Sequence, residues 1–287
     1  MKKINLEQGT EPWLAWRKTV ITATDAPAIL GSSPWTSAYK CWQKKLGLID
    51  EQKSTEAMER GKTMEPEARA HFIERYGIEM EPAVVESSVY DFLGASLDGM
   101  CDREILEIKC GGTKLHTMAS EGIIPQYYLD QIQHQLFVTG AERCYYYSYN
   151  GKDGICIEVL PDITFIDRFL PKARDFWRAV AFSEPPAMEI SDYYNMNDNL
   201  DWQECSRVYQ ETDTAIKFLE EKKDTLRKKL IELCADQSCL GSGLRVMKTV
   251  MRGRVAYDEI PEIKNVDLDK YRKKSTMTWK IMIDQKT

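Results

Sequence analysis

The sequence predicts an α/β (α+β) fold: a central mixed β-sheet flanked by helices, followed by a long C-terminal helix and a small β-rich appendage. Three observations support this prediction. Along residues 1–190, segments with apolar residues at helical spacing alternate with short β-branched and aromatic runs, which is typical of helices packed over one sheet. A Pro185-Pro186 break and a polar stretch then end this region. Beyond them, residues 206–235 are highly charged with a narrow apolar stripe, which predicts a long helix.

The helical segments before the break are recognised by their period and their ends. The clearest covers residues 61–77, where Gly77 stops the helix and Pro66 is acceptable only in the first turn. Glu65 is therefore expected at or near the start of that helix. Thr22 and Thr24 are both suitable N-caps for a short helix within residues 13–30. Further helices are expected in residues 37–48, 123–140 and 164–182.

Strands are expected between these helices. Residues 83–110 are β-rich, with three runs separated by short polar breaks, which predicts a meander in the core of the sheet. A second hairpin is expected in residues 144–160, around the glycine-containing loop "NGKDG".

Residues 191–287 are expected to form a separate C-terminal region. Its long helix has an apolar stripe as narrow as a coiled-coil seam, made of Leu219, Leu226, Leu230 and Leu233. Such a helix packs on the body of the protein or on another protomer. Residues 243–260 and 276–283 alternate apolar with basic or polar residues around a tight Arg252-Gly253 turn, which predicts a small strand-rich appendage.

Composition indicates a reduced, cytosolic protein. The eight cysteines are scattered without a C-x-x-C motif, and the first residues, "MKKINLEQGT", lack the apolar core of a secretory signal. No stretch approaches the ~20 consecutive apolar residues that a membrane span requires, so no membrane association is expected.

The net charge of −6 is unevenly distributed. From Leu240 onward there are 11 Lys and Arg against 6 Asp and Glu, giving +5 and leaving −11 for residues 1–239. An acidic body with a basic tail suits a metal-binding carboxylate site in one part and a phosphate-contacting surface in the other. Charge alone is equally compatible with ordinary solvated surface.

The stretch "SLDGMCDREILEIKC", residues 96–110, predicts a hairpin with an acidic site. If Asp102 and Arg103 are its turn residues, Asp98 faces Glu107 across the ladder, where two like charges are destabilising. Lys109 lies on the same strand face as Glu107 and offsets one charge. Hard oxygen ligands of this kind suit Mg²⁺ or Mn²⁺. A surface hairpin with ordinary salt bridges is the alternative, although the apolar neighbours make an unpaired carboxylate costly.

Four motifs in order, "WRKTVITATDAPAILGSSP", "GKTMEPEARAHF", "SLDGMCDREILEIKC" and "YYLDQIQHQLFVTG", give the chain a family resemblance. Over roughly residues 10–180 it resembles the YqaJ-type viral recombinase nucleases, relatives of phage lambda exonuclease within the restriction-endonuclease-like superfamily. The resemblance implies a restriction-endonuclease-like core and a Mg²⁺-dependent enzyme that digests one strand of duplex DNA from a 5′ end. It further implies a single-strand annealing protein as partner, a trimeric ring, and a phage or prophage protein in the bacterial cytoplasm.

The same resemblance assigns roles to individual residues. It implies one or two Mg²⁺ ions, replaceable by Mn²⁺, held by Asp98, Glu107, the Ile108 carbonyl and Glu65. It implies a catalytic set of Glu65, Asp98, Glu107, Lys109 and Gln131, in which Lys109 positions the attacking water and Gln131 helps to hold it. Glu67 is a rival to Glu65, and Tyr127 is a weaker candidate for which core packing is the simpler role.

Arg17 and Thr24 match the arginine and hydroxyl that hold the 5′-phosphate of the DNA end in this family. A guanidinium grips phosphate through paired N–H groups, which makes the match physically reasonable. The chain departs from lambda exonuclease at Ser88, near the place of an additional acidic residue, so a second metal ion is less securely implied.

Two other functions remain open at this point. One is a structure- or sequence-selective DNA endonuclease on the same scaffold. The other is a catalytically silent protein that binds DNA ends for recombination, in which the basic C-terminal region dominates. Four tryptophans in the first 42 residues are candidates for stacking on DNA bases, with core packing as the simpler role: Trp13, Trp16, Trp35 and Trp42.

Overall fold

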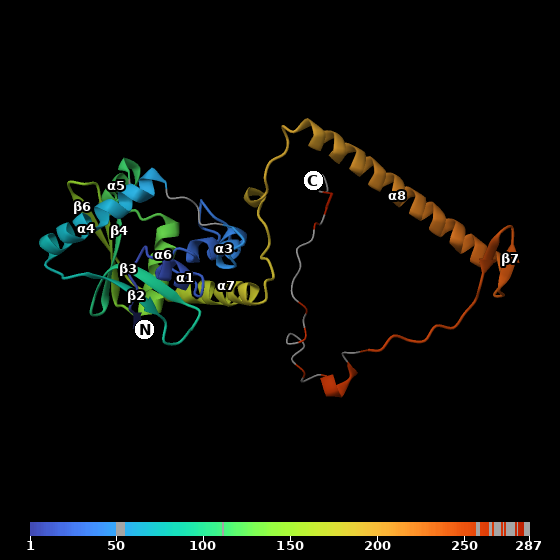
Figure 1. The fold of residues 1–287 in the computed structure, drawn as a ribbon, viewed down its shortest axis with the longest axis horizontal. Helices are drawn as coiled ribbons and strands as arrows, with labels where there is room; N and C mark the ends of the chain where they lie inside the picture. Colours follow the sequence, from blue (N-terminus) through green and yellow to red (C-terminus); the bar gives the residue numbers. More distant parts are fainter. Residues whose placement is uncertain are drawn as a thin grey trace. The chain divides into compact units, whose positions relative to one another are not determined.

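The computed structural model describes residues 1–49, 55–110, 112–256, 259–263, 266, 271, 273, 279 and 281–283. The chain divides into two compact units, Met1–Tyr193 and Tyr194–Thr287 (Figure 1).

The first unit is built on a six-stranded sheet whose spatial order follows the chain, β1-β2-β3-β4-β5-β6. Strands β4 and β5 pair in parallel, and the other neighbouring strands pair antiparallel, so the sheet is mixed as predicted. The strands are β1 (Lys2–Ile4), β2 (Glu81–Glu86), β3 (Gly94–Cys101), β4 (Glu104–Lys109), β5 (Arg143–Tyr149) and β6 (Gly154–Val159).

Helices cover both faces of this sheet (Figure 1). One face is buried under an apolar cluster shared with α2 (Ala26–Leu30), α3 (Ala38–Lys45), α5 (Thr113–Ser120), α6 (Gln126–Thr139) and α7 (Ile163–Ala181). The opposite face packs against α4 (Glu56–Tyr76) and α1 (Glu11–Arg17). The predicted α/β architecture is therefore confirmed, with a sheet buried between two helical layers.

The predicted register of the acidic hairpin is correct for three pairs and ends at the fourth. Cys101 pairs with Glu104, Met100 with Ile105, and Gly99 with Leu106. Asp98 and Glu107 do not form a ladder pair, because β3 bulges at this point. One residue of β2, Pro82, stands opposite two residues of β3, Asp98 and Gly99.

The cause of the bulge lies in the neighbouring strand. A proline has no backbone N–H to give to a ladder, so it is found at edges and bulges of sheets. A bulge bends its strand and redirects a side chain. Pro82 therefore releases Asp98 from regular pairing. The carboxylate of Asp98 accepts a hydrogen bond from the Ile108 N–H at 2.7 Å.

Helix α4 differs from its prediction at its start. It begins at Glu56 and contains Pro66 in its interior, so Glu65 lies in the middle of the helix and not at its beginning. An internal proline removes one helical hydrogen bond, here to the carbonyl of Lys62. Lys62 and Pro66 are both on the exposed side of the helix, where water can replace that bond. The predicted end at Gly77 is correct, with φ of +67° at that residue.

The second unit contains α8 (Leu200–Leu233), β7 (Cys239–Gly241), β8 (Leu244–Val246) and the short 3-10 helix η3 (Pro261–Ile263). The long helix starts earlier than predicted because Asn199 caps it, accepting a hydrogen bond from the Trp202 N–H at 2.9 Å. The β7–β8 hairpin turns at Ser242 and Gly243 and not at Arg252-Gly253, which lies in coil. Much of the predicted strand at 276–283 lies outside the described residues. No helix in the described parts of the chain is long and apolar enough to span a bilayer.

Candidate active site

The predicted acidic residues converge where β3 bulges and β4 ends. Glu107, in β4, is buried, with only 2% of its surface exposed. Asp98 is half-buried beside it, held by the Ile108 N–H. Ile108 therefore enters the site through its amide, and the role predicted for its carbonyl stays a prediction.

Three donors satisfy the buried carboxylate of Glu107. Oε1 accepts hydrogen bonds from Lys109 Nζ and from Gln131 Nε2, the latter at 2.7 Å. Oε2 accepts from Gln135 Nε2 at 2.6 Å. Gln131 and Gln135 lie one turn apart on α6 and so point to the same side of that helix. The structure thus unites Glu107, Lys109 and Gln131 as predicted and adds Gln135.

Helix α4 supplies the third carboxylate from the other face of the sheet. Arg69, one turn after Glu65, donates to its Oε1 at 2.5 Å and to the backbone oxygen of Asp98 at 2.6 Å. Arg69 therefore ties Glu65 to the bulge. The rival residue Glu67 is exposed and accepts a hydrogen bond from the Tyr149 hydroxyl at 2.6 Å. Glu65 is the glutamate that the structure brings to this site.

The three carboxylates repel one another. Burial raises the pKa of Asp98 well above its ordinary value, and the charges of Glu107 and Glu65 raise it further. Burial also raises the pKa of Glu65, an effect that Arg69 opposes and Glu107 reinforces. When all three acids are ionised, Lys109 and Arg69 leave a surplus of one negative charge in a partly desolvated site, so the raised pKa values reflect charge that a cation would neutralise.

Burial alone would lower the pKa of Lys109, but the carboxylates of Glu107 and Asp98 outweigh it and raise the pKa above its ordinary value. Lys109 is therefore an ammonium group at neutral pH. In that form it donates hydrogen bonds and cannot act as a base.

The residues present fit a divalent cation by their chemistry. Carboxylate oxygens and surplus negative charge are what Mg²⁺ and Mn²⁺ bind. Two buried polar atoms next to the acids, Gln135 Oε1 and the Tyr146 hydroxyl, also lack a protein hydrogen-bond partner. Within the described residues no three acidic, His or Cys side chains are gathered in metal-holding geometry. The carboxylates instead face their protein donors, so ion binding requires them to turn.

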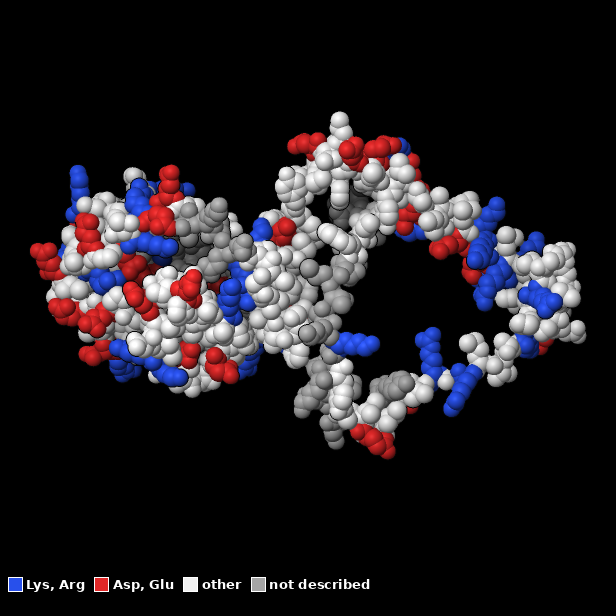
Figure 2. All heavy atoms as spheres, viewed as in Figure 1, with Lys and Arg blue, Asp and Glu red and all other residues white. Residues whose placement is uncertain are grey.

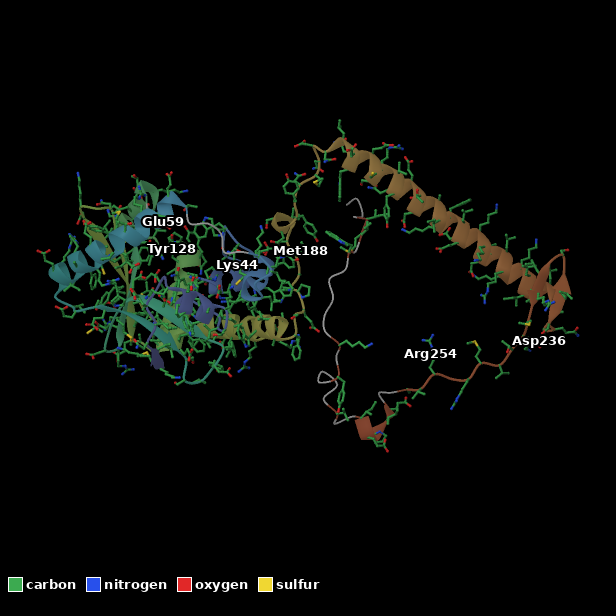
Figure 3. All side chains as sticks on the ribbon, viewed as in Figure 1. Lys44, Glu59, Tyr128, Met188, Asp236 and Arg254 are labelled. Carbon is green, nitrogen blue, oxygen red and sulfur yellow. The ribbon has the colours of Figure 1, made fainter. Side chains whose placement is uncertain are left out.

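An aromatic cluster leads from this site to the surface. Tyr128, labelled in Figure 3, belongs to α6. Lys109 Nζ lies 4.7 Å from the centre of its ring. The ring centres of Tyr128 and Tyr127 are 4.5 Å apart in an edge-on contact, and those of Tyr127 and Trp35 are 4.6 Å apart. The Trp35 side chain is 64% exposed, unlike Trp16 and Trp42, which are buried. Of the four tryptophans, Trp35 is thus the exposed one, since Trp13 is half-buried.

Arg17 and Thr24 are brought together as predicted. The Arg17 guanidinium donates to Thr24 Oγ1 at 3.0 Å and lies 4.7 Å from the Trp13 ring centre. Beneath them, Lys45 donates to the backbone oxygen of Arg17 at 2.6 Å and forms an ion pair with Asp25 at 2.5 Å. The structure therefore holds Arg17 by its backbone and leaves the exposed Thr24 hydroxyl beside it.

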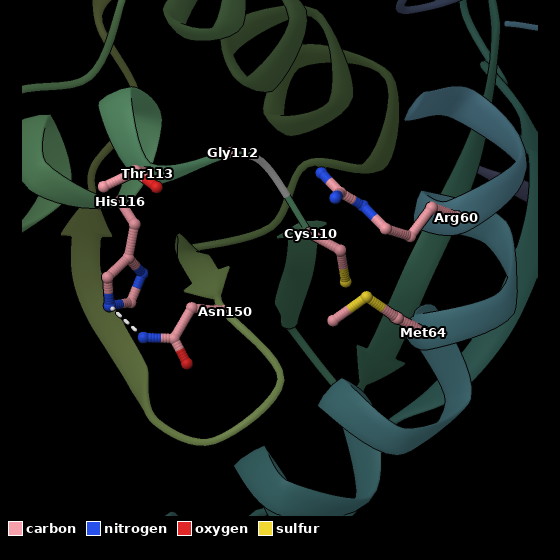
Figure 4. A pocket seen from close by; sticks show the side chains of 7 residues that line it. All are labelled: Arg60, Met64, Cys110, Gly112, Thr113, His116 and Asn150. Atoms are coloured by element: carbon pink, nitrogen blue, oxygen red, sulfur yellow. Dashed lines mark hydrogen bonds between the residues drawn. The ribbon is translucent and has the colours of Figure 1, made fainter. Parts of the chain in front are cut away.

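A pocket of about 250 Å³ opens directly after Lys109 (Figure 4). Helix α4 lines one side, and the start of α5 with the loop after β5 lines the other. On this second side, Asn150 and His116 are hydrogen-bonded to each other at 3.1 Å. Its lining residues are Arg60, Met64, Cys110, Gly112, Thr113, His116 and Asn150.

Sequence reasoning missed Gln135 and Arg69 as members of the site. The signal for Gln135 was an amide on the buried stripe of a helix, where an apolar residue is the norm. The signal for Arg69 was its position four residues after Glu65 on one helix. Gly99, beside Asp98, serves core packing, because a Cβ there would meet Met80 Cβ at 2.9 Å and Leu106 Cβ at 3.0 Å.

The first unit is similar to known viral recombinase and alkaline exonuclease domains. Residues 12–142 match the family model of the YqaJ-like viral recombinase domain, which confirms the resemblance inferred from the four motifs. The chain is 28% identical over 196 residues to the uncharacterized protein YqaJ of Bacillus subtilis (strain 168). That match covers 65% of this chain and 61% of YqaJ, so the chain spans about three fifths of that relative.

Solved structures give the same answer for the fold. The alkaline exonuclease LHK-Exo from Laribacter hongkongensis superposes with a TM-score of 0.54 and 25% identity, covering 60% of this chain and 93% of that one. A crystal structure of LHK-Exo in complex with dAMP gives a TM-score of 0.54 with 26% identity over the same shares.

Proposed function

We propose that this chain is a Mg²⁺-dependent deoxyribonuclease that digests linear duplex DNA from its 5′ ends and leaves 3′ single-stranded overhangs. The observation that supports this most is the meeting of Asp98, Glu107 and Glu65 around Lys109, with negative charge in excess. Likeness to LHK-Exo, an alkaline exonuclease, supports the same reaction class.

Asp98, Glu65 and Glu107 would hold Mg²⁺, with the Ile108 carbonyl as a further ligand. When bound, the ion supplies charge stabilisation for the phosphodiester and lowers the pKa of water. The remaining work belongs to the chain. Lys109, kept protonated by its carboxylates, donates a hydrogen bond that orients the attacking water, while Gln131 and Gln135 fix the carboxylate of Glu107.

The choice of a 5′ end is assigned to Arg17 and Thr24. A guanidinium and a hydroxyl 3.0 Å apart together offer donors to a terminal phosphate. Asp25 is paired with Lys45 below them, so its negative charge does not oppose an incoming phosphate. The exposed indole of Trp35 gives a base at the DNA end a surface for stacking, which is worth about 1–3 kcal/mol per base.

The pocket after Lys109 has a role in the same proposal. Arg60 brings positive charge to it, and Thr113, His116 and Asn150 bring polar atoms. These groups suit a released nucleotide, and LHK-Exo has been crystallised with dAMP.

The decisive test incubates the protein and Mg²⁺ with end-labelled linear duplex DNA beside closed circular duplex. We expect linear DNA to be degraded from its 5′ ends and circles to stay intact. Lys109→Ala should slow the reaction about 10²-fold or more, whereas Lys152→Ala, at an exposed lysine between β5 and β6, should not. Cutting of circles would assign the site to an endonuclease, and inactivity on both substrates would leave only DNA-end binding.

A second experiment tests the phosphate site. Arg17→Ala should weaken the preference for 5′-phosphorylated over 5′-hydroxyl ends by about ten- to a hundredfold, since a charged hydrogen bond is worth roughly 1.5–3 kcal/mol. Arg17→Lys should keep part of that preference. Equal rates on both ends in the wild type would exclude this role. A protein partner that anneals the overhangs and a trimeric assembly remain part of the proposal, to be tested by co-purification and by mass measurement.

A further inference from the structure

Helix α8 carries a heptad repeat along its full length. Positions a and d follow one another at spacings of three and four residues from Trp202 to Leu233, which is the pattern of a left-handed coiled coil. Position a is occupied by Trp202, Tyr209, Ile216, Lys223 and Leu230, and position d by Cys205, Thr212, Leu219, Leu226 and Leu233. Five consecutive heptads extend the seam to roughly 45 Å at 1.5 Å per residue.

Nothing in the described part of the second unit covers this seam. Its large apolar side chains are exposed by 37% or more, among them Leu219 at 60% and Leu233 at 72%. Monomeric proteins rarely expose a continuous apolar patch of this extent. A second helix is the partner whose shape such a seam fits.

The distribution of charge along α8 indicates which helix is its partner. Its first half, residues 200–216, has four acidic residues and one basic, a net charge of −3. Its second half, residues 217–233, has six basic residues and four acidic, a net charge of +2. Figure 2 shows acidic side chains gathered over the start of α8 and basic ones toward its β7 end. The helix is therefore complementary to a reversed copy of itself.

The polar residues of the seam favour the same direction. In a parallel pair, Lys223 would face its own copy at an a position, placing two ammonium groups together. In an antiparallel pair centred on the Ile216 and Leu219 layer, Lys223 faces Thr212, with the acidic Glu211 and Asp213 beside it. Each large residue of the first half then meets a leucine of the second, Trp202 with Leu233 and Tyr209 with Leu226.

We propose that α8 is a dimerisation element in which two copies of this chain pair antiparallel through the seam. The proposal concerns the second unit and does not depend on the nuclease chemistry of the first. The pairing involves α8 alone, so it is compatible with a trimeric assembly of the nuclease domains: α8 would then join one trimer to a second and double the mass.

Mass measurement of the full chain by light scattering tests the pairing. Leu219→Lys should halve the mass of the assembly. Phe218→Lys makes the same chemical change at the adjacent exposed residue, which lies outside the seam, and should leave the mass unchanged. Circular dichroism of both variants confirms that α8 stays helical. A mass that Leu219→Lys leaves unchanged, or a mass that falls equally in both variants, would overturn the proposal.

Thiol cross-linking tests the direction. With a short bismaleimide, L230C should give a cross-link between Cys205 of one copy and the introduced thiol of the other, because positions 205 and 230 share a layer only when the helices are antiparallel. Wild-type protein should give no link between the two copies of Cys205. A strong link between those two cysteines, located by peptide mass spectrometry, would show that the helices run parallel.

Discussion

Glu107 illustrates how one buried charge organises its surroundings. Its two oxygens accept hydrogen bonds from three side chains, and the group is almost fully removed from water. A buried carboxylate without donors is very costly, so these residues serve the fold as well as the chemistry. Gln135 is fully buried. Like Gln131, it donates a hydrogen bond to the Glu107 carboxylate, so both glutamines can position that group.

Gln135→Leu removes the donor to Glu107 Oε2 while keeping most of the side-chain volume. We expect a loss of about 1–3 kcal/mol in the free energy of unfolding, because the carboxylate oxygen stays buried without a partner. Mn²⁺ affinity should fall by about 10- to 100-fold, measured by titration calorimetry. Gln133→Leu is the matched control on the same helix, since Gln133 donates to Leu160 and not to the site. Equal effects of the two changes would remove Gln135 from the site.

Gly99 makes a prediction about packing. Gly99→Ala places a methyl group 2.9 Å from Met80 Cβ and 3.0 Å from Leu106 Cβ, and both neighbours are core residues with little room to move. Overpacking of this kind costs about 1–3 kcal/mol. Urea denaturation should show that loss, whereas Gly61→Ala, in α4 with nothing within 4 Å of the new methyl, should be neutral or stabilising. Unchanged stability of the Gly99 variant would mean that the backbone at the bulge shifts at little cost to accommodate the methyl group.

At the scale of elements, the sequence predicts what is local and misses what a neighbouring strand imposes. The hairpin register followed from counting around Asp102 and Arg103, because a two-residue turn fixes the pairing. The bulge could not be counted, since it depends on Pro82 in a different strand. The start of α4 was also predicted wrongly, because a proline is normally accepted only in the first turn of a helix. The structure shows that Pro66 lies in the interior of α4, which begins at Glu56.

The Asp25–Lys45 ion pair should fasten α3 to the segment that joins α1, which ends at Arg17, to α2. Both side chains are largely buried, and Lys45 also donates to the backbone oxygens of Arg17 and Val20 at 2.6 Å each. Asp25→Asn leaves this ammonium without its counter-charge, which should cost about 3–5 kcal/mol at pH 7. Lys45→Met with Asp25→Asn removes both charges and should recover much of that loss.

The pKa of Asp25 gives the same pair a pH dependence. Burial opposes its ionisation, but Lys45 and Arg17 outweigh burial and lower the pKa to about 2. A lowered acid pKa adds stability above the unfolded value of 3.8 that is lost as the pH falls toward 2. The wild type should lose about 2 kcal/mol of stability from this group over that interval. Asp25→Asn should lack this component in denaturation curves between pH 4 and 2.

His134 gives α6 a second pH dependence at higher pH. Its ring is fully buried, Nε2 donates to the Gly94 backbone oxygen at 2.9 Å, and burial lowers the pKa to about 4. The neutral ring stabilises the fold above pH 6.5, and this contribution is lost as the pH falls toward 4. Between pH 7 and 5 the loss should be roughly 2 kcal/mol. His134→Gln should flatten the stability curve there, and an unchanged curve would rule out this source.

At the scale of the whole molecule, the two units differ in how they bury apolar surface. The buried hydrophobic residues described lie in the first unit, apart from Cys234. The Pro185-Pro186 break signals a change in the chain, but the last contacts of the first unit are tertiary: Ser37 Oγ donates to Asp192 Oδ1 at 2.5 Å. Sequence patterns do not reveal such a contact, because its partners are far apart in the chain.

This difference predicts how each unit behaves alone. A chain ending after Tyr193 keeps the sheet, both helical layers and the acidic site, so it should unfold in one cooperative transition with a melting temperature within a few degrees of the full chain. It should also lack the mass doubling that we assign to α8. The described part of residues 194–287 has almost no core, and a lone helix is marginal in water, so the helicity of this fragment should rise with concentration as copies pair. Calorimetry of the first fragment and circular dichroism of the second at several concentrations test both expectations. A non-cooperative first fragment would mean that the nuclease fold requires the C-terminal unit, and concentration-independent helicity in the second would remove self-pairing as the source of its stability.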